Sequence, residues 1–288
     1  MPFPLPPGDH LRQLTVGDRQ RTYHLHIPPG DAGGSWPLVL GFHGGASNGR
    51  AFAAASGLSD KADAAGFVVA YPNGSGEREK LLTWNAGNCC GYAYHQASDD
   101  VGFTHALLDD LAAALSIDPR RVFATGLSNG AMLAYRLAAE MADRIAAIAP
   151  VAGPVALDRC APSRPVSVIH LHGTEDLFTP LEGGVGPRSA TRVSHTSVAE
   201  TIRRWVAANG CPPEPNTAQL PDLADDGTHV VRSLYGPGRE GSEVVLYVIH
   251  GGGHTWPGQR SNTFLFGPST RNLIANDAIW DFFSRHGR

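Results

Sequence analysis

The pentapeptide at residues 126–130, of sequence GLSNG, places Ser128 where a serine hydroxyl can act as a nucleophile. Apolar residues 122–125 precede it, and residues 131–140 follow with the composition of a helix. In a strand–turn–helix context, a G-x-S-x-G segment forms a sharp turn that exposes the serine hydroxyl above the sheet. We therefore expect Ser128 to attack a carbonyl carbon, which is the chemistry of a hydrolase.

A second segment matches the same pattern at residues 45–49, of sequence GASNG, and it also follows an apolar run, at residues 38–42. With 34 glycines in 288 residues, chance matches of this kind are expected. The pentapeptide alone therefore does not choose between Ser47 and Ser128. The choice depends on the residues that would assist each serine.

An acidic residue for such a site is predicted after the apolar run at residues 166–171. A serine hydroxyl needs a base, usually a histidine, and a carboxylate must orient that histidine. Where the serine lies on this kind of turn, the acid and then the base follow it along the chain, on loops that leave later strands. Asp176 lies just beyond the predicted strand end and is the expected acid, with Glu175 as the alternative.

The base is predicted on the glycine-rich segment that follows the apolar run at residues 244–249. His254 lies on that segment, and we expect it to take the proton of Ser128. His250 is still at the strand end, so we expect it to pack against the strand. The order serine, acid, histidine gives His254 a significance that one histidine among 13 would lack.

Backbone N–H groups must stabilise the negative charge that develops on the carbonyl oxygen. The residue after the nucleophile, Asn129, is the first expected donor. The second is expected from the segment His43-Gly44-Gly45, where we favour Gly45 over Gly44; a plain tight turn is the alternative for this segment. Ser47 lies in the loop that this segment begins, and no earlier His-Gly-Gly segment could serve it. The later serine is therefore the predicted nucleophile.

Two tryptophans, Trp84 and Trp256, lie near these loops in the sequence and are candidates for a substrate platform. A partly exposed indole can stack on an aromatic acyl group or a sugar; packing in the core is the alternative for both residues. Asp99 and Asp100 form an adjacent pair of carboxylates before a predicted helix. We expect them to cap that helix rather than to do chemistry.

The pattern along the chain predicts an α/β fold, with a doubly wound, mostly parallel sheet flanked by helices on both faces. Short apolar runs typical of buried parallel strands alternate with helical patterns. The runs are at residues 38–42, 67–71, 122–125, 145–149, 166–171 and 244–249, and the helical patterns at 50–65, 101–115, 194–208 and 272–283.

The ends of the predicted sheet differ from its centre. Residues 21–27 alternate between apolar and polar and predict an antiparallel strand, and residues 228–235 with 244–249 predict a hairpin at the sheet edge. Residues 73–97 and 209–227 predict long loops. No linker separates two cores, so residues 1–288 are predicted to form a single domain.

The composition excludes several classes of partner. The formal net charge is −4 and lysine and arginine do not cluster, which argues against a nucleic-acid partner. No stretch approaches the roughly 18 apolar residues of a membrane-spanning helix, so no membrane partner is expected. The first residues lack the apolar core of a signal peptide, so we expect either a cytoplasmic protein or a secreted one whose signal has been removed.

The four cysteines, Cys89, Cys90, Cys160 and Cys211, include no C-x-x-C spacing, so we expect no metal site. We expect some of them to be paired, with four reduced thiols as the alternative. Cys89 and Cys90 either bond to each other or pair elsewhere. Cys160 and Cys211 are both expected at the N-terminal edge of the strands.

As a set, seven segments of the chain resemble the esterase family that groups poly(3-hydroxybutyrate) depolymerases with feruloyl and acetylxylan esterases. They lie at residues 38–45, 84–91, 99–103, 118–122, 126–130, 172–176 and 253–258, in the family's order. The resemblance implies an α/β-hydrolase fold, ester cleavage through an acyl-enzyme, and no cofactor or metal. It supports Ser128, Asp176 and His254 as the triad, with Gly45 and Asn129 as the oxyanion donors.

The expected function is a serine carboxylic-ester hydrolase acting on esters of the polyhydroxyalkanoate type, such as poly- or oligo-hydroxybutyrate, or on a related polyester. The alternative is a feruloyl, cinnamoyl or acetylxylan esterase acting on plant cell-wall esters. A serine peptidase of the prolyl-oligopeptidase type and an inactive binding module share the fold and are less expected. The expected partner is the ester itself, a small molecule or a polymer chain, and the expected assembly is a monomer or a weak homo-oligomer.

Overall fold

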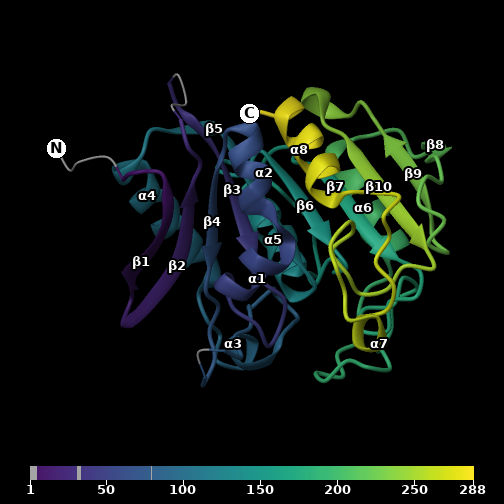
Figure 1. The fold of residues 1–288 in the computed structure, drawn as a ribbon, viewed down its shortest axis with the longest axis horizontal. Coiled ribbons are helices and arrows are strands. Elements are labelled where there is room, and N and C mark those ends of the chain that lie inside the picture. The colour runs from purple at the N-terminus through teal and green to yellow at the C-terminus, as the bar shows by residue number, and fades with distance from the viewer. Residues whose placement is uncertain (1–4, 31–33, 79) are drawn as a thin grey trace.

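The computed structural model describes residues 5–30, 34–78 and 80–288, and within them ten strands form one sheet (Figure 1). The strand order is β1-β2-β4-β3-β5-β6-β7-β10-β9-β8. The strands are β1 (Gly8–Val16), β2 (Arg19–Ile27), β3 (Trp36–Phe42), β4 (Val68–Pro72), β5 (Ile117–Leu127), β6 (Ala147–Val151), β7 (Ser167–Gly173), β8 (Asn216–Gln219), β9 (His229–Tyr235) and β10 (Val244–His250).

The six central strands, β4, β3, β5, β6, β7 and β10, run parallel to one another. β4, β6 and β7 are buried along their whole length, which fits apolar runs that are covered on both faces. The outer strands β1, β2, β9 and β8 pair antiparallel with their neighbours, and β1 alternates between half-buried and exposed positions. The predicted doubly wound, mostly parallel sheet is therefore confirmed.

Helices cover both faces of the sheet (Figure 1). One core contains Phe103, Leu133 and Trp205 and lies beneath α4, α5 and α6; the other contains Phe52 and Phe282 and lies beneath α1, α2 and α8. Short α3 and α7 and the 3-10 turn η1 lie in loops. The bounds are α1 (Gly49–Ser56), α2 (Leu58–Ala65), α3 (Gly91–His95), α4 (Asp100–Ala114), α5 (Asn129–Glu140), α6 (Val198–Asn209), η1 (Arg239–Gly241), α7 (Thr263–Phe266) and α8 (Ala275–Arg285). None of the helices in the described ranges is long and apolar enough to cross a membrane.

Two sequence expectations need correction, and one strand was not expected. The helix expected at residues 50–65 is two helices, because Gly57 takes a left-handed φ of 64° and ends α1 before α2 begins. The loop expected at residues 209–227 contains β8, so the β9–β10 hairpin is one strand inside the sheet edge. β1 has no counterpart in the expected elements.

The parallel centre of the sheet positions the site. β5, β6, β7 and β10 are neighbours that point the same way, so the loops after β5, β7 and β10 leave the same edge of the sheet. In open sheets of this kind, ligands bind at the carboxyl ends of the strands. The segments that carry Ser128, Asp176 and His254 leave the sheet at this edge.

Candidate active site

Ser128 occupies a strained turn between β5 and α5, with φ 57° and ψ −120°. A non-glycine residue at such a φ is unusual and is typical of functional sites. The two flanking glycines explain how the turn is packed. A Cβ on Gly126 would lie 2.6 Å from the carbonyl carbon of Gly130, and one on Gly130 would lie 2.2 Å from the carbonyl oxygen of Phe42. Only glycine fits at either position, so the turn seats tightly against the end of β3.

Asp176 and His254 form a hydrogen-bonded pair, with 2.7 Å between His254 Nδ1 and Asp176 Oδ2. The loop after β7 also holds the carboxylate in place: Oδ1 accepts the backbone N–H groups of Phe178 and Thr179, each at 2.8 Å. The Thr179 hydroxyl lies 3.0 Å from Asp176 Oδ2 and 2.8 Å from the carbonyl oxygen of Ala152, and its one proton can serve either. Asp176 is therefore fixed as an acceptor for the imidazole.

The electrostatics keep Asp176 ionised. Burial raises the pKa of its carboxyl group, but the adjacent His254, then His172 and the Thr179 N–H, lower it more, so the pKa lies below the ordinary value. Because an ionised carboxylate only accepts, the proton of this pair is on Nδ1 of His254. His254 Nε2 is then free to act as the base.

Aromatic side chains shield the base. The His254 ring is 7% exposed, and its centroid lies 4.9 Å from that of Phe178 and 6.5 Å from that of Phe266. In the part of the chain that the structure describes, no hydrogen bond joins Ser128 Oγ to His254. Catalytic hydrogen bonds are often long before substrate binds, so this geometry is compatible with a nucleophile–base pair.

The segment His43-Gly44-Gly45 lies against the nucleophile turn. Positions where a Cβ would stand on Gly44 and Gly45 are 3.6 Å from Ser128 Cβ and 3.8 Å from Asn129 Cβ, respectively. His43 Nδ1 bonds to the carbonyl oxygen of Gly44 at 2.7 Å, and its Nε2 accepts the N–H of Gly74 at 3.0 Å. Within a trans peptide the C=O and N–H point in opposite directions, so holding the Gly44 carbonyl toward the His43 ring turns the Gly45 N–H away from that ring.

His43 is locked in one neutral form by these two partners. A carbonyl oxygen only accepts, so Nδ1 carries the proton, and Nε2 must be unprotonated to accept from Gly74. Burial, with a smaller effect from the charge of Arg21, lowers the pKa of His43 to about 4. His43 therefore acts here as a fixed support for the glycine loop.

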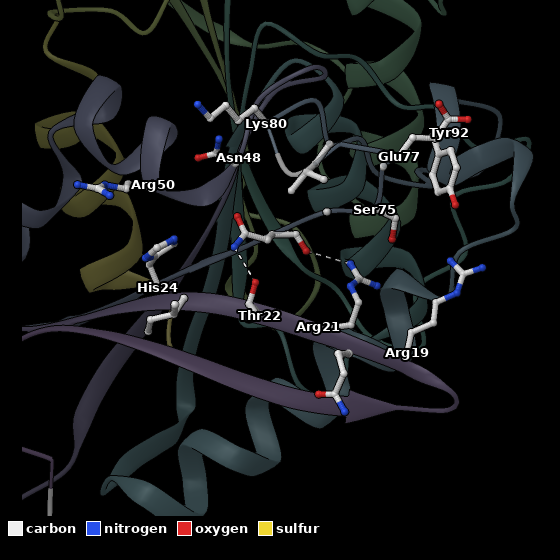
Figure 2. A pocket seen from close by; sticks show the side chains of 16 residues that line it. Arg19, Arg21, Thr22, His24, Asn48, Arg50, Ser75, Glu77, Lys80 and Tyr92 are labelled. Carbon is white, nitrogen blue, oxygen red and sulfur yellow. Dashed lines mark hydrogen bonds between the residues drawn. The ribbon is translucent and has the colours of Figure 1, made fainter.

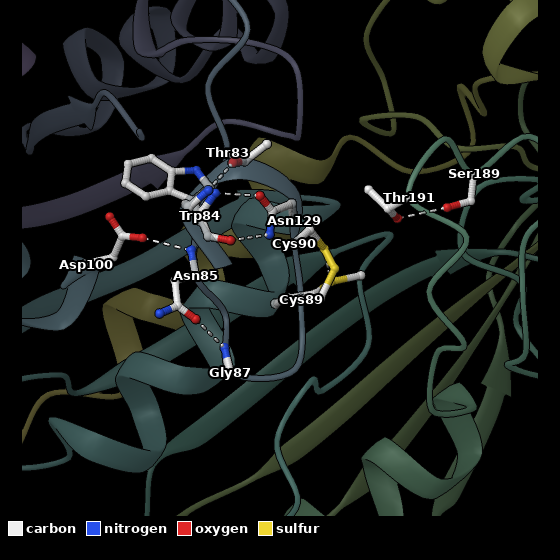
Figure 3. The surroundings of a disulfide bond; sticks show 12 residues. Thr83, Trp84, Asn85, Gly87, Cys89, Cys90, Asp100, Asn129, Ser189 and Thr191 are labelled. Atoms are coloured by element: carbon white, nitrogen blue, oxygen red, sulfur yellow. Dashed lines mark hydrogen bonds between the residues drawn. A yellow bond between two sulfur atoms is a disulfide. The ribbon is translucent and has the colours of Figure 1, made fainter. Parts of the chain in front are cut away.

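The expected platform at Trp84 is wrong, because its indole is fully buried. Its Nε1 donates to the carbonyl oxygen of His43 at 2.9 Å, and its ring packs edge-on against Phe42. The Asn129 side chain clamps the Trp84 backbone, accepting from its N–H at 2.7 Å and donating to its carbonyl at 3.0 Å (Figure 3). Trp84 thus supports the loop that Gly44 and Gly45 belong to.

Trp256 is also buried, at 5% exposure, so the second expected platform is wrong too. Its Nε1 donates to Asn276 Oδ1 at 2.8 Å, and its ring packs edge-on against Phe52. It joins the base loop to α1 and α8. An aromatic residue next to a catalytic loop was in both cases a packing residue.

The alternatives to the predicted site residues lie elsewhere. Glu175 is exposed to solvent, whereas Asp176 is buried. His250 stacks on His229, with centroids 4.3 Å apart, at the end of β10. Asp99 caps α4 by accepting from Gly102 N, as expected, but Asp100 is a buried member of that helix and pairs with Arg21.

A buried hydrogen-bond chain behind the acid was not foreseen. It runs from the Tyr135 hydroxyl to His170 Nδ1 (2.9 Å), from His170 Nε2 to His172 Nδ1 (3.1 Å), and from His172 Nε2 to the carbonyl oxygen of Thr179 (2.7 Å). Since that carbonyl only accepts, His172 Nε2 carries a proton; His172 Nδ1 then accepts from His170, and His170 Nδ1 accepts from Tyr135. Each donor in the chain points toward the acid loop.

The chain ends beside the acid, because His172 Nε2 lies 3.5 Å from Asp176 Oδ2. Burial lowers the pKa of both His170 and His172, which agrees with two neutral rings. His195 also lies near this group; burial lowers its pKa, and Asp176 opposes that shift. Alternation within the run at residues 167–173 was the one sequence signal for His170 and His172, and His195 had none because it lies in an irregular segment.

The cysteines divide into two groups. Cys89 and Cys90 are bonded to each other, next to the Trp84 backbone that Asn129 holds (Figure 3). Cys160 is half-buried and Cys211 is buried, and both are free thiols. Across the described ranges, no three histidine, cysteine or acidic side chains gather as metal ligands.

The fold is that of an α/β-hydrolase, and comparison with known proteins gives the family. The model of the family described as "Esterase PHB depolymerase" matches residues 21–193. The chain belongs to this family, which confirms the resemblance in the sequence. The protein is therefore a carboxylic ester hydrolase.

Curated relatives agree with this assignment. The protein NocK of Nocardia uniformis subsp. tsuyamanensis, which its name assigns to the esterases, is 33% identical over 94% of this chain and 81% of its own length. Feruloyl esterase B of Piromyces equi is 27% identical over 76% of this chain but only 39% of its own length.

Solved structures share the fold at low identity. The acetyl xylan esterase from Aspergillus awamori has a TM-score of 0.65 at 17% identity, covering 96% of this chain and 99% of its own. The structure titled pOPH has a TM-score of 0.61 at 14% identity, covering 100% of this chain and 89% of its own.

Proposed function

We propose that Ser128, Asp176 and His254 are the catalytic triad of this esterase and that its substrates are esters of hydroxy acids, of the polyhydroxyalkanoate type. The observation that carries the triad is the 2.7 Å bond between His254 and Asp176 at the sheet edge where Ser128 occupies a strained turn. The oxyanion donors are the N–H groups of Gly45 and Asn129.

In the first half of the reaction, His254 Nε2 takes the hydroxyl proton of Ser128 as Oγ attacks the ester carbonyl carbon. Asp176 stabilises the imidazolium that forms, because its ionised carboxylate already accepts the Nδ1 proton. The N–H groups of Gly45 and Asn129 bind the oxygen that becomes negative. When the C–O bond breaks, His254 gives its proton to the departing alkoxide, and an acyl-enzyme remains on Ser128.

The second half repeats these steps with water. His254 Nε2 takes a proton from the water molecule as its oxygen attacks the acyl carbon. The same two N–H groups hold the second tetrahedral intermediate. Its collapse returns the proton to Ser128 Oγ and releases the carboxylic acid.

The surface next to His254 is apolar and favours an ester with few hydroxyl groups. Leu177, Phe264, Leu265 and Phe266 are exposed by 41, 88, 43 and 38%, and with Phe178 they form what we call the apolar rim. The rim belongs to the site, because His254 N donates to the carbonyl oxygen of Phe266 at 2.6 Å. These five side chains offer no hydrogen bonds to the hydroxyl groups of a sugar, and unpaired polar groups are costly to bury.

The second candidate is an esterase for feruloyl or acetyl groups of plant cell walls. It is supported by the relatives named feruloyl esterase and by two phenyl rings, Phe178 and Phe266, that an aromatic acyl group could contact. The two candidates differ in whether the alcohol part of the ester is a sugar.

A panel of substrates tests the proposal. Purified protein is assayed with trimeric 3-hydroxybutyrate, methyl ferulate, acetylated xylan and a peptide anilide, with the Ser128→Ala variant as the blank. We expect the highest kcat/KM for the hydroxybutyrate trimer and no cleavage of the anilide. A higher kcat/KM for methyl ferulate or acetylated xylan would establish the second candidate instead.

A further inference from the structure

A cleft outside the candidate active site lies beside β2, with a volume of about 790 Å³ (Figure 2). That volume is in the range of sites for small molecules. Its walls come from β2, from the start of α1 and from residues 73–77, 80 and 82. The charged and titratable side chains that line it are Arg19, Arg21, His24, Arg50, Glu77 and Lys80.

The cleft is strongly cationic. Of the described residues that line it, Arg19, Arg21, Arg50 and Lys80 are cations, and Glu77 is the one carboxylate. No ion pair within the described ranges neutralises Arg19, Arg50 or Lys80. Asn48, the N-cap of α1, also lines the cleft, so the positive end of this helix dipole adds to the field.

Arg21 gives the cleft a fixed floor. Its side chain is 6% exposed, and Nη2 donates to Asp100 Oδ1 at 2.8 Å and to the carbonyl oxygen of Asn73 at 3.1 Å. The guanidinium carbon lies 4.0 Å from the ring centroid of Phe103. In the described structure, buried Nε has no hydrogen-bond partner. The ion pair with Asp100 holds the Arg21 guanidinium in place, so Arg21 acts as a fixed part of the cleft.

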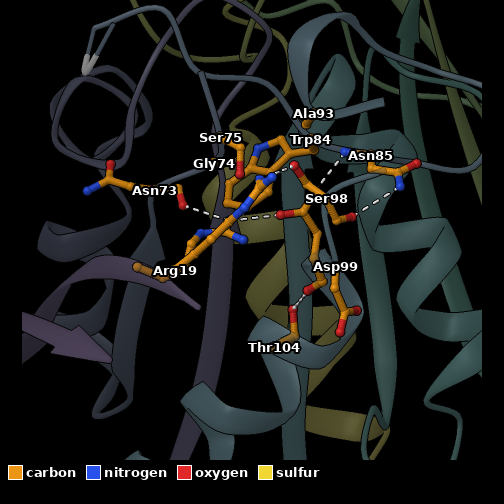
Figure 4. A network of polar contacts seen from close by, with 12 residues as sticks. Arg19, Asn73, Gly74, Ser75, Trp84, Asn85, Ala93, Ser98, Asp99 and Thr104 are labelled. Carbon is orange, nitrogen blue, oxygen red and sulfur yellow. Dashed lines mark hydrogen bonds and ion pairs between the residues drawn. The ribbon is translucent and has the colours of Figure 1, made fainter. Parts of the chain in front are cut away.

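The wall beside Arg19 is also rigid. Arg19 Nη1 donates to Ser98 Oγ at 3.2 Å, and the carbonyl oxygen of Ser98 accepts from Asn85 Nδ2 at 3.1 Å (Figure 4). The N–H of Asn85 in turn donates to Asp100 Oδ2 at 2.7 Å. Arg19 and Arg21 are thus joined to one network, and neither needs a large rearrangement to receive an anion.

The cleft is close to the nucleophile. Gly74 lines the cleft and donates to His43, which holds Gly44, and Gly44 lies against Ser128. Along the chain, Asn48 in the cleft is three residues from Gly45, a span of at most about 11 Å even when fully extended. The segment at residues 43–45 thus connects the lining of the cleft to Ser128.

We propose that this cleft is an anion-binding subsite that takes the free carboxylate of an ester chain whose reacting carbonyl lies at Ser128. The proposal rests on the proposed function. Oligomers of hydroxy acids end in a carboxylate, whereas acetyl and feruloyl groups have none. Arg19, Arg50 and Lys80 supply N–H donors and positive charge, which a carboxylate group accepts as charge-assisted hydrogen bonds.

The test compares matched esters that differ in one charge. On the acyl side, 4-nitrophenyl monosuberate is compared with neutral 4-nitrophenyl octanoate; on the alcohol side, 6-(butyryloxy)hexanoate is compared with hexyl butyrate. The variant Arg50→Gln/Lys80→Gln removes two exposed cations without touching the triad. Arg120→Gln is the control, because Arg120 is an exposed cation near the start of β5, far along that strand from Ser128.

We expect 6-(butyryloxy)hexanoate to have a lower KM than hexyl butyrate in wild-type protein, because the free carboxylate of a hydroxy-acid oligomer lies on the alcohol side of each ester bond. The double variant should raise that KM about tenfold with little change in kcat, because one lost charge contact of this size is worth a factor of ten in affinity. The neutral esters and the Arg120→Gln variant should show no change, and added salt should weaken the preference.

Two results would overturn the subsite. One is an absence of charge preference on the alcohol side, with or without a preference on the acyl side; the other is a double variant that affects charged and neutral esters equally. In either case Ser128-dependent hydrolysis of the neutral esters would leave the proposed function standing. If Ser128→Ala hydrolysed the neutral esters at the wild-type rate, the proposed function itself would fail.

Discussion

The two G-x-S-N-G segments differ by a one-residue shift in where the following helix begins. In residues 126–130 the helix α5 begins at Asn129, and the residue with φ 57° is Ser128. In residues 45–49 the helix α1 begins at Gly49, and the residue with φ 57° is Ala46 rather than the serine. The same letters therefore place a serine at the strained turn in one segment and one residue past it in the other.

The two asparagines show the same difference. Asn48 caps α1 through a hydrogen bond from the backbone N–H of Ala51 to its side chain. Asn129 lies inside α5, and its side chain is free to clamp the backbone of Trp84. One segment forms a strained turn at its serine and the other forms the loop that faces that turn, so the same pattern takes two different backbone conformations.

The largest expected effect is on kcat, when each of the two serines is replaced by alanine in turn. Ser128→Ala should lower kcat by about a millionfold, the scale seen when a nucleophile of this type is removed. Ser47→Ala should change kcat by less than about twofold, because a half-buried serine off the strained turn has no base. Steady-state hydrolysis of 4-nitrophenyl butyrate measures both. A large loss in Ser47→Ala would reverse the assignment of the two segments.

The next largest effect is expected from Asp176→Asn, which removes the carboxylate that orients His254 and so leaves Ser128, like Ser47, without an oriented base. Asp176→Asn should lower kcat by about 10⁴-fold, because an amide no longer fixes the Nδ1–H form of His254. Glu175→Gln is the control and should retain activity, because Glu175 is exposed. A Glu175→Gln variant with the greater loss would show that the acid had been misassigned.

Asp176 also gives a pH signature in stability. Its pKa is lowered in the folded state, so it contributes stability that is present above about pH 4, the ordinary pKa, and is lost as pH falls through the folded value. Urea unfolding of wild type and Asp176→Asn should differ most near pH 7 and converge in acid. If the free energies of unfolding of the two proteins differed by the same amount at every pH down to the most acidic one, the lowered pKa of Asp176 would be contradicted.

Alanine substitutions at Gly130 and Gly45 test how tightly each of the two segments is packed. Gly130→Ala should lower the free energy of unfolding by about 3 kcal/mol, because its Cβ would stand 2.2 Å from the carbonyl oxygen of Phe42. Gly45→Ala should change it by less than about 0.5 kcal/mol, since its Cβ would stand 3.8 Å from Asn129 Cβ, an ordinary contact. Urea denaturation measures both; equal losses would mean that the two turns are equally crowded.

The smallest expected effect is the difference in stability loss between alanine variants of Asn129 and Asn48. Asn129→Ala should cost about 2 kcal/mol, because it leaves the buried N–H of Trp84 unpaired, although its own backbone N–H remains. Asn48→Ala should cost about 1 kcal/mol, the usual value of a helix cap. Thermal unfolding ranks them, and a greater loss in Asn48→Ala would contradict the clamp.

The sequence was sufficient to predict the parallel strands that position the candidate site, because local pattern controls them. Buried parallel strands read as short apolar runs, and the residues that follow their carboxyl ends include Ser128, Asp176 and His254. The expected platforms failed because an aromatic side chain carries no local sign of burial. The Trp84 indole is buried against Phe42 and bonds to the carbonyl oxygen of His43, 41 residues away.

Other features were missed for the same reason. The chain from Tyr135 to His172 depends on α5 packing beside β7, which no single segment encodes. The cleft likewise needs β2 next to residues 73–77, 80 and 82, and its four cations are spread over about 60 residues of sequence, from Arg19 to Lys80. Long-range pairing, rather than residue type, brings these groups together.

The neutral histidines buried around the site set an acid limit on this enzyme. His43, His170 and His172 are each uncharged in the folded protein, with pKa values lowered by burial, whereas in the unfolded chain they take up protons near pH 6.5. Below that pH the unfolded chain binds more protons, so each unit of acidification favours unfolding. The histidines that support the loops carrying Gly44 and Asp176 therefore also make mildly acidic surroundings unfavourable to this fold.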